Sequence, residues 1–231
     1  SRGLGDVYKR QSLGYVGEEE VEEEIKPTVF PITPPPLPKP KPSLKTFSDV
    51  GPGYWAKEPI EYLATLNIIG GYPDNTFRPD WALTRAELAT LLIKAKEIAA
   101  PELKEDVFPD LPRTHWAAKY VKAAMGLKYV SGYPDNTFRP VKALTRAEGI
   151  IIFSRFAELP IPESVAVDPF SDLPKTHWAA KYVEAAKNAG LLLYLANKPF
   201  GPNADLTRAE AAEILSKTPF GKAKIKELLG E

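Results

Sequence analysis

The chain contains the same block three times, and this repetition constrains the fold more than any other feature. A Phe-x-Asp triplet at residues 47–49 recurs at 108–110 and 170–172, so successive copies lie 61 and then 62 residues apart. A nine-residue segment at 71–79 recurs unchanged at 132–140. A repeated block of this length is usually one supersecondary unit that buries its apolar face against its neighbours. The three copies should therefore share one core.

Each copy carries the sequence Leu-Thr-Arg-Ala-Glu, which predicts the start of a helix. In this capping box, the Thr hydroxyl accepts a hydrogen bond from the backbone N–H of the Glu, and the Glu carboxylate accepts one from the N–H of the Thr. The second helix of each copy should therefore begin at Arg85, Arg146 and Arg208. A capping box has no need of arginine. An arginine that recurs there in every copy is the strongest candidate for a functional residue.

The first helix of each copy is expected to begin near Trp55, Trp116 and Trp178, with Thr114 and Thr176 as N-caps in the second and third copies. A turn of sequence Tyr-Pro-Asp-Asn then separates the two helices. One helix–loop–helix unit has too little apolar surface to fold alone. We therefore predict an all-α protein in which three such units form a pseudo-threefold bundle, because three copies are few for an open solenoid.

The expected domain boundaries follow the repeat. We place the repeats at residues 43–105, 106–166 and 167–231, after an acidic and proline-rich linker at residues 1–42. Eight of the sixteen residues from 27 to 42 are proline. Such a segment forms either a disordered tail or a polyproline spacer of about 50 Å. We interpret the chain as a C-terminal fragment, so that any export signal would lie upstream of this sequence.

Composition argues against several classes of function. The 30 basic and 30 acidic residues balance, and no Lys/Arg run stands out, so a nucleic-acid partner is not expected. The absence of cysteine excludes disulfides and thiol catalysis. The apolar runs are too short for a membrane span. The Tyr-Pro-Asp-Asn turn lacks the spacing and the terminal Glu of a calcium loop, so we expect no metal site and no cofactor.

The Phe-x-Asp triplets, the tryptophans, the repeated segment at 71–79 and the Leu-Thr-Arg-Ala-Glu motifs resemble, in this order, those of S-layer homology domains. The resemblance covers roughly residues 47–219. It implies three repeats around a pseudo-threefold axis, with the second helices at the centre and grooves between neighbouring repeats. It also implies non-covalent anchoring of an exported protein to the bacterial cell wall, which would place the chain at the cell surface, in the cell wall or in the S-layer. The implied partner is a secondary cell-wall polysaccharide, commonly bearing pyruvate ketals, or a peptidoglycan-linked polymer.

A pyruvate ketal is a carboxylate, and a guanidinium at a helix N-terminus suits such a group because the helix dipole and free N–H groups also favour an anion. Tryptophan faces suit sugar rings, glycines allow close approach to the backbone, tyrosines supply hydroxyl donors, and aspartates accept from sugar hydroxyls. The candidate polysaccharide-binding residues are Arg85, Arg146, Arg208, Trp55, Trp116, Trp178, Asp49, Asp110, Asp172, Gly71, Gly132, Tyr72 and Tyr133.

All of these residues except the two tyrosines also have a purely structural explanation. For the tryptophans, packing in the core is the favoured role, because large aromatic side chains usually dominate burial. The aspartates fit a role in turns or caps at least as well, and the glycines fit left-handed helix C-caps at least as well. For the arginines, the alternative is an ion pair with a carboxylate of the neighbouring repeat. We favour ligand binding there because an exposed pair contributes only about 0–1 kcal/mol.

The third copy departs from the pattern. Leu193 stands where the other copies have Gly71 and Gly132, within a loop altered from residue 193 to 200. We therefore expect fewer than three grooves to bind ligand. The sequence leaves two other functions open: a glycan-processing enzyme and a purely self-assembling surface module. Caps and turns explain the carboxylates better than catalysis does, and His115 and His177 occupy equivalent repeat positions rather than one site, so we do not expect an enzyme.

Overall fold

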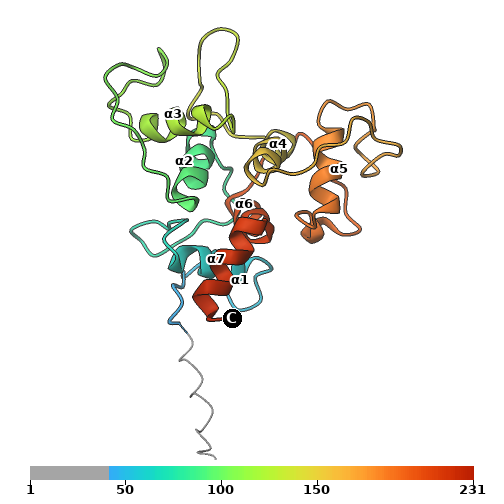
Figure 1. Ribbon diagram of the computed structural model, residues 1–231. Helices are drawn as coiled ribbons and strands as arrows, with labels where there is room; N and C mark the ends of the chain where they lie inside the picture. Colours follow the sequence, from blue (N-terminus) through green and yellow to red (C-terminus); the bar gives the residue numbers. More distant parts are fainter. Residues whose placement is uncertain (1–41) are drawn as a thin grey trace, which may run out of the picture. The chain divides into compact units, whose positions relative to one another are not determined.

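The computed structural model describes residues 42–231, which belong to one compact unit. Except for Pro42, the predicted linker lies outside the described residues. Within these residues the structure is all-helical, as predicted, with isolated β-bridges in place of a sheet (Figure 1). The helices are α1 (Lys57–Thr65), α2 (Arg85–Ala95), α3 (Ala118–Gly126), α4 (Arg146–Phe156), α5 (Ala180–Asn188), α6 (Arg208–Lys217) and α7 (Pro219–Leu229), with a 3-10 turn η1 at Leu193–Leu195.

The three capping boxes form as the sequence predicts. Helices α2, α4 and α6 begin at the three arginines, and in each the Thr hydroxyl accepts from the N–H of the Glu three residues later. The Glu carboxylate accepts in return from the Thr N–H at 2.8–3.0 Å, as Glu87 does from Thr84. These helices are buried over most of their surface, so the boxes fix the start of each core helix.

The repeats interlock rather than stack. The second helix of each repeat packs on the first helix of the following repeat: α2 on α3, α4 on α5, and α6 on α1 (Figure 1). The last contact joins the third repeat back to the first and closes the bundle. Because each apolar helix face is covered by a different repeat, no repeat completes its own core.

A ring of backbone hydrogen bonds lies where the three repeats meet. The N–H of Leu83 donates to the carbonyl of Leu206 at 2.8 Å, Leu206 donates to Leu144 at 2.8 Å, and Leu144 donates to Leu83 at 3.0 Å. All three leucine side chains are buried. The ring places one leucine of each repeat around a common pseudo-threefold axis and satisfies backbone groups that would otherwise be buried without partners.

The expected N-caps of the first helices are wrong. The N-cap positions are Ala117 and Ala179, and no side chain caps these helices in the usual way. Thr114 instead lies inside a turn in which the N–H of His115 donates to the carbonyl of Pro112 at 2.8 Å. Nδ1 of His115 accepts a hydrogen bond from the N–H of Ala117 at 3.2 Å. The two histidines therefore hold the turns that lead into α3 and α5.

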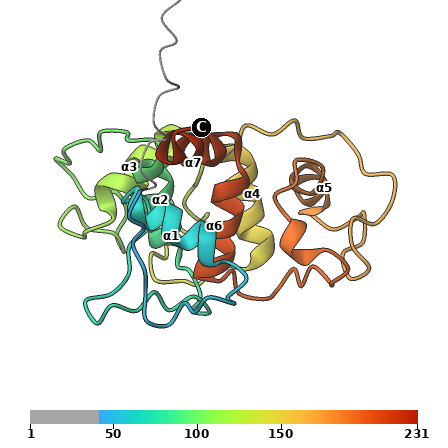
Figure 2. The ribbon, with the colours of Figure 1, turned by 90° about the horizontal axis from the view of Figure 1, so that it is seen from below.

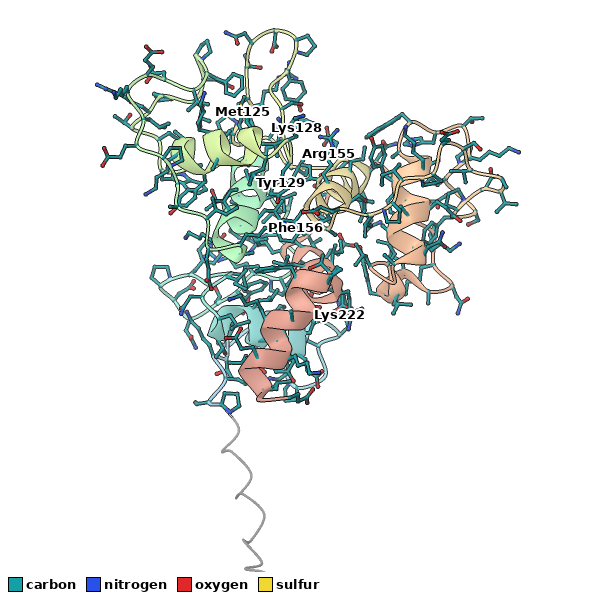
Figure 3. All side chains as sticks on the ribbon, in the orientation of Figure 1. Met125, Lys128, Tyr129, Arg155, Phe156 and Lys222 are labelled. Carbon is teal, nitrogen blue, oxygen red and sulfur yellow. The ribbon has the colours of Figure 1, made fainter. Side chains whose placement is uncertain are left out.

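Helix α7 follows the third repeat and was not predicted. Thr218 caps it by accepting from the N–H of Gly221 at 3.0 Å, and Pro219 occupies its first turn. It packs on α6 and α1 (Figure 2). The ring of Phe220 also meets Phe156 at the end of α4, where Tyr129 packs on the same ring (Figure 3). No helix within residues 42–231 has the length and apolar character to cross a membrane.

Candidate functional site at the seams between repeats

The start of each second helix is inserted against the loop of the next repeat, and this contact defines three seams. Seam I joins repeats 1 and 2 at Arg85, seam II joins repeats 2 and 3 at Arg146, and seam III joins repeats 3 and 1 at Arg208. In seam I, the N–H groups of Arg85 and Ala86 donate to the carbonyls of Lys142 and Pro140 at 3.0 and 3.1 Å. The other seams repeat these bonds. The expectation of free helix N–H groups for an anion is therefore wrong.

Arg85 and Arg208 use one edge of their guanidinium groups to hold the neighbouring loop. Arg85 donates from Nε to the carbonyl of Phe138 at 2.8 Å and from Nη2 to that of Ser131 at 2.7 Å. Arg208 makes the equivalent bonds to Phe77 at 2.9 Å and to Gly70 at 2.6 Å. Each guanidinium has five N–H donors, so the edge between Nη1 and Nη2 remains for another acceptor.

That second edge reaches solvent. Nη1 of Arg85 and of Arg208 makes no hydrogen bond within residues 42–231. Neither Nη1 atom is fully buried, so each keeps some contact with solvent. The two residues are nevertheless only 9% and 7% exposed. Burial lowers the pKa of both guanidinium groups, although arginine keeps its charge. Seams I and III therefore each present a nearly buried cation with unused donors.

No carboxylate neutralises these two cations directly. Among the ion pairs within the described part of the chain, none includes Arg85 or Arg208. Glu148 acts on Arg85 through space, but its oxygens are held by Thr145 and by Lys142 at 2.7 Å. Glu87, which lines the cavity at seam III, acts on Arg208 through space in the same way. A buried cation that has no carboxylate within ion-pair distance keeps donors for an added anion. Seams I and III can therefore accept an anion.

Seam II differs because its arginine already has an anion. Arg146 donates from Nε and Nη2 to Oε1 of Glu210 at 3.0 and 2.6 Å, and from Nη1 to the carbonyl of Phe200. The carbonyl of Leu192, which corresponds to those of Gly70 and Ser131, accepts instead from Leu195 within η1. The altered loop of the third copy thus removes an acceptor, and Glu210 replaces it. The ion pair considered as the alternative role of the arginines occurs in this seam.

The cavities at seams II and III are each lined by residues of all three repeats. A cavity of about 690 Å³ in seam II is lined by Arg146 of repeat 2, Tyr194 of repeat 3 and Trp55 of repeat 1. A cavity of about 120 Å³ in seam III is lined by Arg208 of repeat 3, Gly70 of repeat 1 and Trp116 of repeat 2. In both seams the tryptophan comes from the repeat that does not form the seam. By this pattern, Trp178 of repeat 3 would lie at seam I.

The tryptophans are not core residues, so the favoured structural role is wrong for them. Trp55, Trp116 and Trp178 are 49%, 54% and 58% exposed. Their positions precede α1, α3 and α5, whose buried faces are formed by smaller side chains. Trp55 stacks on Tyr194 of the third repeat, with ring centroids 5.2 Å apart and planes inclined by 15°. Half-exposed indole rings at cavity walls leave an apolar face for another ring.

The aspartates of the Phe-x-Asp triplets hold the loops. Asp49 accepts from the N–H groups of Phe77 and Arg78, each at 2.7 Å. The equivalent pairs of bonds recur in the other repeats, for Asp110 and Asp172. Burial opposes ionisation of Asp172, but the backbone donors still hold its pKa below the usual value. This is the turn-holding role expected as one alternative, and contact with a sugar hydroxyl stays a prediction.

Close packing within the loop, rather than a left-handed helix C-cap, explains why Gly71 and Gly132 are glycines. Neither Gly71 nor Gly132 has a positive φ; the left-handed residues after the first helices are Asn67, Lys128 and Gly190. The C-cap prediction is therefore wrong. A Cβ on Gly71 would lie 2.6 Å from the carbonyl oxygen of Thr76 and would also overlap the Phe47 ring. The glycine lets the loop pack on the Phe of its own triplet.

The two tyrosines stack on arginines. The guanidinium of Arg78 lies 3.8 Å from the centre of the Tyr72 ring, and that of Arg208 lies 5.3 Å from it. Tyr133 contacts Arg85 at 4.7 Å in the same way. The hydroxyl of Tyr133 is buried without a partner in the described structure, so its ring rather than its hydroxyl contacts the seam. A role as hydroxyl donor stays a prediction.

Two residues at the seams were missed. Glu210 was assigned only to its capping box, although its second oxygen neutralises Arg146. Trp81 precedes the first capping box and is 56% exposed, while Lys142 and Ala204 occupy its position in the other copies. This break in the repeat pattern was the available signal for Trp81. No local signal identified Arg146 as the partner of Glu210, because this pairing depends on the course of the altered loop at residues 193–200.

Comparison with known proteins agrees with this architecture. Residues 46–89, 107–148 and 169–212 each match the S-layer homology domain. The chain therefore belongs to the S-layer homology domain family, whose repeats account for the bundle and its seams. The family and the relatives below indicate a protein of the bacterial cell surface or cell wall.

Three relatives show how such repeats are distributed. The chain is 41% identical to a cellulosome-anchoring protein of Acetivibrio thermocellus over 139 residues, which cover 59% of this chain and 31% of that protein. It is 29% identical to an S-layer protein of Bacillus licheniformis over 181 residues, 78% of this chain and 20% of the relative. It is 32% identical to an amylopullulanase of Thermoanaerobacterium thermosulfurigenes over 175 residues, 74% of this chain and 9% of the enzyme. The chain thus spans less than a third of the length of these relatives.

Proposed function

We propose that residues 43–231 form a non-catalytic module that attaches a surface protein to the bacterial cell wall by binding an anionic polysaccharide in seams I and III. Membership in the S-layer homology family and similarity to a cellulosome-anchoring protein support attachment to the wall. The observation that carries the choice of ligand is the pair Arg85 and Arg208, which are nearly buried, lack a carboxylate partner and keep one guanidinium edge open.

The carboxylate of a pyruvate ketal fits this edge. A carboxylate and a guanidinium form charge-assisted hydrogen bonds that contribute about 1.5–3 kcal/mol each when they are shielded from water. The sugar ring that bears the ketal would lie against the exposed indole beside the seam, which for Arg208 is Trp116. An uncharged sugar at the same place would leave the cation without a counter-ion and should bind more weakly.

Seam II is not expected to take the same ligand. A ligand carboxylate there would compete with Glu210, which already pairs with Arg146. Two carboxylates close together repel each other, and displacing Glu210 would leave that carboxylate without its partner. The module should therefore bind two equivalents of ligand, in line with fewer than three working grooves.

Sedimentation of the purified module with cell walls tests the proposal. A variant with Arg85→Lys and Arg208→Lys keeps both charges but loses the planar edge, so we expect at least a tenfold loss of binding. Arg146→Lys is the matched control and should bind as the wild type does. Circular dichroism checks that both variants are folded. Wild-type binding by the folded double variant would refute the arginine mechanism.

A turnover assay on wall glycan tests the non-catalytic part of the proposal. We expect no release of new sugar ends when the module is incubated with isolated walls. Reproducible release, lost when a candidate carboxylate such as Glu213 is replaced by Gln, would instead support the glycan-processing alternative. Self-assembly of the module in the absence of wall polymer, with no binding to walls, would support the surface-assembly alternative.

A further inference from the structure

Trp81 is an exposed aromatic residue at one seam only. Its side chain is 56% exposed, although it lies two residues before the buried core leucine Leu83. Lys142 holds the corresponding position in the second repeat and Ala204 in the third. Nothing in the packing of the bundle requires an indole here, since the other two repeats form the same loop without one.

The indole of Trp81 is held in a fixed orientation. The guanidinium of Arg78 lies 4.4 Å from its ring centre and 3.8 Å from that of Tyr72, so it contacts both rings. Arg78 is fixed in turn by Asp74, which accepts from Nη2 at 3.1 Å, and by Asp49, which accepts from its backbone N–H. A rigid aromatic ring loses little conformational entropy when a ligand stacks on it.

The same residue is tied to Arg208 of seam III. The carbonyl of Trp81 accepts from the N–H of Arg208 at 2.9 Å. The ring of Tyr72 contacts both side chains, with its centre 6.0 Å from that of Trp81 and 5.3 Å from the guanidinium of Arg208. The exposed indole is therefore linked, through one tyrosine ring, to the cation that we assign to the ligand carboxylate.

We propose that Trp81 forms a second sugar subsite at seam III, which stacks on the sugar residue next to the one that carries the carboxylate. This inference rests on the proposed function. The flat indole presents its negative face to the C–H groups of a neutral sugar ring, whereas Arg208 binds the charged group. Seam I has no such platform, because Lys142 occupies the position and pairs with Glu148 at 2.7 Å. Seam III recognises a longer piece of the polymer than seam I does.

The test compares two ligands by titration calorimetry. One is the single sugar that bears a pyruvate ketal; the other is an oligosaccharide of the wall polymer that contains it. Trp81→Ala should weaken oligosaccharide binding at one of two sites by roughly three- to tenfold. It should leave binding of the single sugar unchanged. Trp81→Phe should restore most of the lost affinity, and Val141→Ala, which shortens an 81% exposed apolar side chain in the next repeat, is the control.

The outcomes separate this inference from the function on which it rests. If the wild type binds both ligands and Trp81→Ala binds both equally well, the subsite does not exist but seam binding stands. If Trp81→Ala weakens both ligands to the same extent, the residue supports Arg208 rather than a second sugar, and the subsite is again wrong. If the wild type binds neither ligand, the proposed function and the subsite both fail.

Discussion

The close packing of Gly71 gives a prediction with a built-in control. A Cβ at Gly71 would lie 2.6 Å from the carbonyl oxygen of Thr76, about 1 Å inside ordinary contact, and would overlap the ring of Phe47. The neighbouring Gly70 has no atom within 4 Å of such a Cβ. Neither residue has a positive φ, so backbone strain does not enter the comparison.

We expect Gly71→Ala to lower the free energy of unfolding by about 1–3 kcal/mol, which is the usual cost of overpacking. For a unit of this size, that corresponds to a melting temperature lower by roughly 2–12 °C. Gly70→Ala should be neutral or slightly stabilising, because alanine restricts the unfolded chain.

Thermal melting followed by circular dichroism, on the two variants side by side, makes the comparison. Equal melting temperatures for Gly71→Ala and Gly70→Ala would refute the packing explanation. Close approach of a ligand to the backbone would then be the only remaining role for Gly71. Gly132→Ala supplies a second copy of the experiment, because its Cβ would lie 2.6 Å from Cζ of Phe108.

Three further predictions concern the seams and the loops. Glu210→Gln keeps a capping group but removes the charge that neutralises Arg146, so calorimetry should show a third equivalent of ketal-bearing sugar; an unchanged stoichiometry would contradict our account of seam II. The Thr137 hydroxyl and the Arg139 guanidinium hold the pKa of Asp135 at about 2, below the model-peptide value of 3.8. Its bonds should therefore stabilise the loop above about pH 4 and be lost as the pH falls through 2, and a carboxyl NMR titration with a midpoint near 3.8 would argue against them. A fragment of residues 43–166 lacks α6, the partner of α1, and should neither melt cooperatively nor bind walls; a cooperative melt would show that ring closure is dispensable.

The local rules of helix formation predicted much of the fold. The Thr-x-x-Glu pattern located the starts of α2, α4 and α6, and the repeat predicted the pseudo-threefold bundle. The repeat pattern does not predict helix α7, because this helix lies beyond the last repeat, although Thr218 and Pro219 are a typical start signal. The packing of each second helix on the next repeat was not predictable from the sequence, since every first helix has a similar apolar face.

The location of the arginines where repeats meet was predictable from the sequence, but their surroundings were not. The arginines were singled out because a capping box does not need them, and all three do lie where repeats meet. Their surroundings depend on loops of other repeats. Arg146 meets Glu210 only because the third loop turns into η1, which no pattern near Arg146 indicates. The exposure of Trp55 also depends on tertiary packing, which residue type alone predicts poorly.

Titration of the wild-type module with one wall polysaccharide, before and after removal of its pyruvate ketals, tests the central claim most directly. The structure predicts two binding sites for the intact polymer. Removal of the ketals should weaken both sites at least tenfold, because Arg85 and Arg208 then lose their counter-ion. Equal affinity for the two forms of the polymer would contradict the claim that these arginines recognise a carboxylate.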